Sequence, residues 1–91
     1  MVKSASDFQR ESQEELIRLL STDIDLAFTF LETAEIEADH DPGHSQSALE
    51  KAQRALESVR RFEGRIQYEG TSREIQGRAN ELEAAIQKFG K

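Results

Sequence analysis

Residues 35–53, EIEADHDPGHSQSALEKAQ, contain both histidines and the single proline of the chain. Within them, Asp41 and Pro42 form a helix-start signal. An aspartate can accept hydrogen bonds from the first amides of a helix, and a proline at the first helical position forfeits no intrahelical bond. Ser47 and Glu50 form a capping box one turn later, so the start of the second helix stays open between Asp41 and Ser47. The stretch therefore indicates the boundary between two helices.

The same stretch has the residue types of a metal site, with Asp39, His40 and His44 as candidate ligands. Pro42 interrupts the helix between the two histidines, so they cannot share one helical face. A di-metal bundle needs two Glu-x-x-His pairs and two further glutamates, whereas this chain has one such pair, Glu37 with His40. We therefore expect a turn, with no metal or other cofactor bound.

The residues before this boundary have the pattern of one long helix over about 7–40, preceded by disordered residues 1–5. Ser6 and Gln9 form a capping box at its start. Apolar side chains recur at alternating steps of three and four, which is a heptad pattern. This first stripe consists of Ile17, Leu20, Ile24, Ala27, Leu31, Ala34 and Ala38. A second stripe beside it consists of Leu16, Leu19, Leu26 and Phe30, and Phe28 lies off both.

Two shorter helices are predicted after the boundary, at about 42–68 and 72–89. In the first of them small apolar residues precede large ones, so it should approach the long helix most closely near the turn. Gly70 suits a helix C-terminus, and Thr71 with Glu74 suits the next N-terminus. The alternative is one helix over 44–89 with a local twist at Gly70. Gly64 and Gly77 lie inside the predicted helices, where they could mark close helix crossings or could have no packing role.

Charge and composition favour a single all-α domain over residues 1–91, an antiparallel hairpin or three-helix bundle. Apolar residues make up 36 % of the chain and charged residues 33 %. Residues 1–50 carry 3 basic and 12 acidic side chains, and residues 51–91 carry 9 and 6. The two halves can neutralise each other where helices pack together. Alternatively, an anionic ligand could bind the arginines at positions 54, 60, 61 and 65.

The composition alone argues against several functional classes. A net charge of −6 argues against a nucleic-acid partner, whose phosphates require a basic face. The chain contains no cysteine, so it forms neither disulfides nor thiolate zinc sites. There is no signal-peptide pattern and no apolar run of membrane-spanning length. We expect a cytoplasmic protein that binds neither membranes nor nucleic acid.

Three segments, DLAFTFLETA at 25–34, DPGH at 41–44 and ALESVRRFEGRI at 55–66, resemble short uncharacterised all-helical bacterial proteins. The resemblance covers roughly residues 20–70. It implies a helical hairpin core and brings no activity, cofactor or catalytic residue with it. Residues 47–62 are also similar to the second helix of a tetratricopeptide repeat, but the period of about 34 residues of that family is absent.

The function class that remains is a helical interaction or oligomerisation module. No arrangement of paired carboxylates, nucleophile with histidine, or glycine-rich phosphate loop predicts an enzyme, so we expect no catalytic residues. The expected partner is a second copy of the chain, in a homodimer, or another helix. The expected interface consists of Leu16, Leu19, Leu26, Phe28 and Phe30, because two shorter helices cannot cover a long helix with two stripes.

Three competing hypotheses stay open. One is a compact monomer in which the third helix covers the interface residues. Another is a ligand-sensing bundle that uses the basic stretch 51–65 or the turn 39–44. The last is an accessory or antitoxin-like regulator whose partner is encoded elsewhere.

Overall fold

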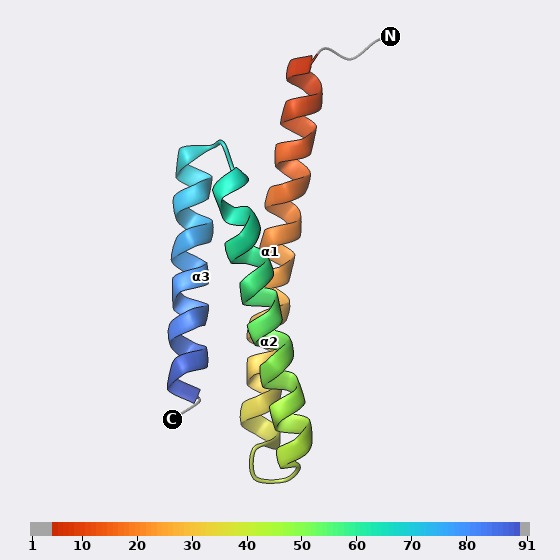
Figure 1. The fold of residues 1–91 in the computed structure, drawn as a ribbon, viewed down its shortest axis with the longest axis vertical. Helices are drawn as coiled ribbons and strands as arrows, with labels where there is room; N and C mark the ends of the chain where they lie inside the picture. The colour runs from red at the N-terminus through yellow and green to blue at the C-terminus, as the bar shows by residue number, and fades with distance from the viewer. Residues whose placement is uncertain (1–4, 90–91) are drawn as a thin grey trace.

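The computed structural model describes the backbone of residues 5–89 and the side chains of residues 10–89. Its helices are α1 (Ala5–Glu37), α2 (Pro42–Phe62) and α3 (Glu69–Phe89), and a 3₁₀ turn, η1 (Glu63–Arg65), follows α2. α1 and α2 form an antiparallel hairpin, and α3 runs beside it in the direction of α1 (Figure 1). The prediction of an all-α, three-helix fold with a long first helix is confirmed.

Two expectations at the N-terminus lie outside the described part of the chain. These are the disorder of residues 1–5, of which only Ala5 is described, and the capping box of Ser6 with Gln9, whose side chains are not described. The backbone of both capping-box residues lies within α1.

The hairpin turn forms where the sequence predicts it. α1 ends at Glu37, three residues earlier than predicted, and the Glu37 carbonyl accepts the amides of His40 at 3.1 Å and Asp41 at 2.8 Å in the turn. Asp41 is the N-cap of α2, its carboxylate accepts the His44 amide at 3.1 Å, and Pro42 follows at the first helical position. This excludes the later helix start at Ser47.

Close approach of α1 and α2 beside this turn is also confirmed. The Ser45 hydroxyl donates to the Ala34 carbonyl at 2.6 Å, and Ser45 is buried. Ala34 lies in the last turn of α1, where carbonyl groups lack the amides that serve them elsewhere in a helix. The neighbouring Ala48 and Ala52 are buried too, and their small side chains allow the two backbones to approach. Toward its N-terminus α1 separates from α2 and extends past it (Figure 1).

The core consists of two clusters that follow one another along the hairpin. The cluster beside the hairpin turn contains Ala27, Leu31, Ala34, Ala48, Leu49, Ala52, Leu82 and Ile86. The cluster beside the α2–α3 connection contains Leu20, Ile24, Val59, Ile66, Ile75 and Ala79. Phe28 and Leu56 contact both clusters. The first stripe of α1 is therefore the core stripe, apart from Ala38, which lies in the turn.

The break between the second and third helices is confirmed, but it lies earlier than predicted. α2 ends at Phe62, and Ile66 adopts an extended conformation, with φ −73° and ψ 122°. This conformation lets Ile66 enter the same cluster as Ile75 of α3, which a continuous helix over 44–89 would prevent. The Tyr68 carbonyl accepts the Ser72 amide at 2.8 Å and begins the hydrogen-bonding of α3.

The expected role of Gly70 as a helix C-terminal cap is wrong. Gly70 lies in the first turn of α3, and no described glycine has a positive φ. Close helix crossing at Gly64 or Gly77 is wrong as well, because a Cβ atom added at either position would meet no atom within 4 Å. The break instead follows from burial of Ile66.

Candidate interaction surface on the first helix

The second stripe of α1 lies on the side of the hairpin away from α3. Asp25 marks the opposite side, because its carboxylate forms an ion pair with Arg78 of α3. At about 100° per residue, the second stripe lies far around the helix from Asp25. Leu19 is 56 % exposed and Leu26 is 47 % exposed. The alternative in which the third helix covers these two leucines is therefore wrong.

The other expected interface residues are less exposed. Leu16 packs at the edge of the cluster beside the α2–α3 connection, and Phe30 packs at the edge of the cluster beside the hairpin turn. Both are half-buried. Phe28 differs from them because it contacts both clusters. We define the candidate surface as Leu16, Leu19, Leu26 and Phe30 together with Asp23, which lies among them in the helical spacing.

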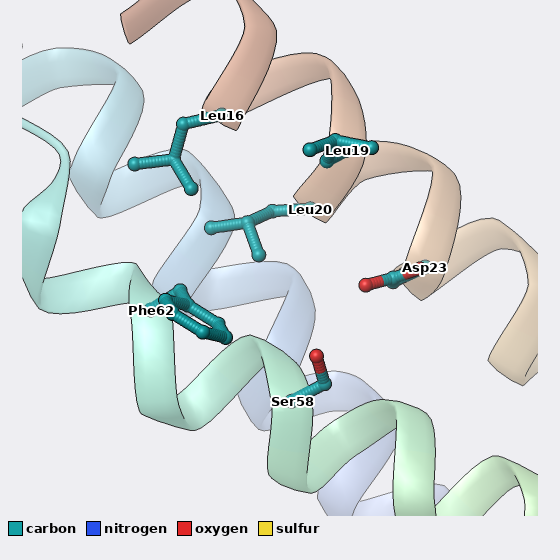
Figure 2. A pocket seen from close by; sticks show the side chains of 6 residues that line it. All are labelled: Leu16, Leu19, Leu20, Asp23, Ser58 and Phe62. Carbon is teal, nitrogen blue, oxygen red and sulfur yellow. The ribbon is translucent and has the colours of Figure 1, made fainter. Parts of the chain in front are cut away.

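An open depression lies between this surface and α2. Its lining residues are Leu16, Leu19, Leu20 and Asp23 from α1, and Ser58 and Phe62 from α2. Figure 2 shows Leu16 and Leu20 pointing toward Phe62, which makes the floor apolar. The Asp23 carboxylate and the Ser58 hydroxyl point toward each other across the opening (Figure 2). Its volume of about 190 Å³ is below the roughly 300 Å³ at which small-molecule sites begin, so a single inserted side chain suits it better.

Cations of α2 and η1 border the same side of the hairpin. The Lys51 ammonium lies 5.6 Å from the centre of the Phe30 ring, and the Arg65 guanidinium lies 4.9 Å from the centre of the Phe62 ring. Both distances are within the range of cation–π attraction. The sequence could have suggested this, since Lys51, Ser58, Phe62 and Arg65 are separated by steps of three, four or seven residues. A partner on this surface would thus meet leucines flanked by positive charge.

The basic stretch 51–65 does not act as one cluster. Arg60 turns toward α3, where it contacts Asn80 at 2.7 Å and Glu83 at 3.3 Å, and it also pairs with Glu63 at 3.3 Å. Arg65 lies against Phe62. Two of the four arginines proposed to hold an anion, Arg60 and Arg65, therefore contact different groups. Neutralisation between the two halves of the sequence occurs at Asp25 and Arg78, whereas Arg60 pairs within its own half.

The histidine turn is exposed. Asp39, His40 and His44 all have exposed side chains, and Asp41 is engaged as the N-cap of α2. Within residues 10–89, no group of three or more histidine, aspartate or glutamate side chains is placed to hold a metal ion.

Gln13 is a structural residue that the sequence did not reveal. Its side-chain amide donates to the Arg65 carbonyl at 2.9 Å and accepts the Gln67 amide at 2.8 Å. α1 thereby binds one carbonyl and one amide of the connection between α2 and α3. No periodic pattern points to such a contact, because it joins residues more than fifty positions apart.

Comparisons with protein-family models, curated proteins and solved structures find no match to this chain. None of the described helices is both long and apolar enough to cross a membrane.

Proposed function

We propose that this chain is a non-enzymatic helical interaction module and that the candidate surface on α1 is its binding site. The observation that carries the proposal is the exposure of Leu19 and Leu26, 56 % and 47 %, on the side of the hairpin that α3 leaves open. Contiguous exposed apolar side chains bordered by polar ones are typical of interaction sites. Their arrangement at helical spacing favours another helix as the ligand, and we propose that the chain associates with itself through this helix.

The shape of the chain supports this proposal. Its accessible surface is 6432 Å², whereas a compact monomer of its mass, 10.3 kDa, exposes about 5400 Å². Its radius of gyration is 15.9 Å, compared with about 12 Å for a compact domain of this length. A partner helix along the hairpin would bury part of this excess surface.

The charges beside the surface narrow the class of ligand. Lys51 and Arg65 lie over aromatic rings at the two ends of this side of the hairpin. Complementary charge speeds association and selects among partners. The partner helix should therefore present leucine-like side chains along one stripe and carboxylates beside them.

The test is the double substitution Leu19→Asn with Leu26→Asn, compared with Ile36→Asn. Ile36 is 69 % exposed on the same helix but lies outside both stripes, so it controls for loss of any exposed apolar side chain. Analytical ultracentrifugation at tens of micromolar should show self-association of the native chain and of the Ile36 variant. The double variant should sediment as one chain of 10.3 kDa, with the melting temperature that the native chain has when it is diluted to the monomer. A native chain that stays monomeric, or a double variant that still associates, would contradict the proposal.

A further inference from the structure

Resting on the proposed function, we infer that the ligand is a second copy of this chain, bound with the two α1 helices antiparallel and a two-fold axis beside Asp23. A two-fold interface is self-complementary: where residue i contacts residue j, residue j contacts residue i. The candidate surface has this property. Leu16 and Phe30 lie seven positions on either side of Asp23, and Leu19 and Leu26 lie four and three positions from it.

Antiparallel packing about this centre covers every apolar side chain of the surface. Leu16 of one copy meets Phe30 of the second copy, and Leu19 meets Leu26. The two exposed leucines of each copy then shield one another. A shift by one heptad would leave Leu16 or Phe30 at the end of the stripe without an apolar counterpart.

The charge distribution favours antiparallel over parallel packing. Glu15 is exposed on α1 just before Leu16, at the border of the candidate surface. In the antiparallel arrangement it approaches Phe30 of the second copy, above which Lys51 lies. In a parallel pair it would approach Glu15 of the second copy and repel it. Antiparallel helices also align their dipoles favourably, with each N-terminus beside a C-terminus.

Asp23 then has a defined place in the assembly. It lies on the candidate surface, half-buried and facing Ser58 across the depression (Figure 2). At the two-fold axis, the Asp23 carboxylates of the two copies approach each other. Their repulsion lowers the affinity of the pair. Asp23 is thus the residue that limits the affinity of the chain for itself.

Cysteine pairing tests the arrangement, because the native chain contains no cysteine. Leu19→Cys and Leu26→Cys variants are prepared separately, checked for native melting temperature, and mixed in a glutathione redox buffer. In the antiparallel pair, identical positions are separated by about 10 Å along the helix, too far for a disulfide, whose Cα atoms lie within about 7 Å. Position 19 of one copy lies beside position 26 of the other. We expect the mixed disulfide to exceed either self-disulfide by at least about ten-fold, which corresponds to about 1.4 kcal/mol.

Every other outcome overturns the inference or the proposed function. Self-disulfides of both variants would show a parallel pair and overturn the inference while leaving the proposed function intact. An absence of disulfide under conditions where the native chain is dimeric would place the interface elsewhere and overturn it too. A native chain that is monomeric in ultracentrifugation would contradict the proposed self-association itself. A cysteine at the exposed position Ile36, which lies off the interface, measures the background of random pairing.

Discussion

The Ser45 hydroxyl of α2 donates to the Ala34 carbonyl of α1 at 2.6 Å, beside the hairpin turn. We predict that Ser45→Ala lowers the free energy of unfolding by about 1–2 kcal/mol, because a buried carbonyl in the last turn of α1 loses its donor. Ser47→Ala, at an exposed position of the same helix, should change it by less than about 0.5 kcal/mol. Urea unfolding of both variants measures the difference, and equal effects would contradict this role of Ser45.

Leu31 and Leu26 provide a matched pair of leucines on α1. Leu31 is 4 % exposed in the cluster beside the hairpin turn, whereas Leu26 is 47 % exposed on the candidate surface. Leu31→Ala should reduce the free energy of unfolding by about 2–5 kcal/mol, because it leaves a cavity. Leu26→Ala should weaken self-association and have a small effect on the stability of the monomer at low concentration. A loss below about 0.5 kcal/mol for Leu31→Ala would mean that the core stripe is misassigned.

The Gln13 side chain both donates and accepts a hydrogen bond, and a substitution can remove the donor while it keeps the acceptor. Gln13→Glu keeps an oxygen for the Gln67 amide but places a carboxylate against the Arg65 carbonyl. We expect a loss of about 0.5–1.5 kcal/mol and faster hydrogen exchange at the Gln67 amide. Ser12→Ala, at the preceding exposed position, is the control. Unchanged exchange at Gln67 in the Gln13 variant would show that the contact does not stabilise the connection.

Gly77→Ala should stabilise the chain. Gly77 lies inside α3, its φ is not positive, and an added Cβ would meet no atom within 4 Å. Alanine in a helix interior gains about 0.5–1 kcal/mol over glycine. Gly70→Ala, in the first turn of α3, should gain less, since helix ends are more loosely constrained. A lower melting temperature for Gly77→Ala would indicate that another molecule packs closely at this position.

Asp23→Asn should strengthen self-association. Two facing carboxylates that are screened by water repel each other by about 1 kcal/mol. Removing this repulsion should lower the dissociation constant roughly five-fold. Asp39→Asn removes the same charge in the exposed hairpin turn and should leave association unchanged. Ultracentrifugation at two salt concentrations measures both variants. Tighter association of both variants alike would attribute the effect to net charge instead of to the two-fold axis.

Local signals in the sequence were sufficient for the hairpin and its core. The Asp41–Pro42 start, the heptad stripe through Leu20 and Ile24, and the small residues beside the turn all correspond to the observed structure. Capping and amphipathic spacing act within one or two helical turns, so a short stretch of sequence carries the information. The second stripe of α1 was also recognisable, and the structure leaves Leu19 and Leu26 of that stripe exposed, whereas Phe28 packs against both core clusters.

The path of the chain after Phe62 and the side of the hairpin that α3 covers depend on tertiary contacts. Gly70 and Thr71 carry the signals of a helix end and a helix start, but α2 already ends at Phe62 and Ile66 is extended, because burial beside Ile75 outweighs local preference. Gln13 then satisfies the backbone of that connection from across the molecule. Arg60 likewise pairs with Glu83 only because α3 lies beside it. By itself the sequence determined which side chains are apolar at helical spacing, whereas only the packing of α3 decided that Leu19 and Leu26 remain exposed, since one short helix can cover only one side of the hairpin.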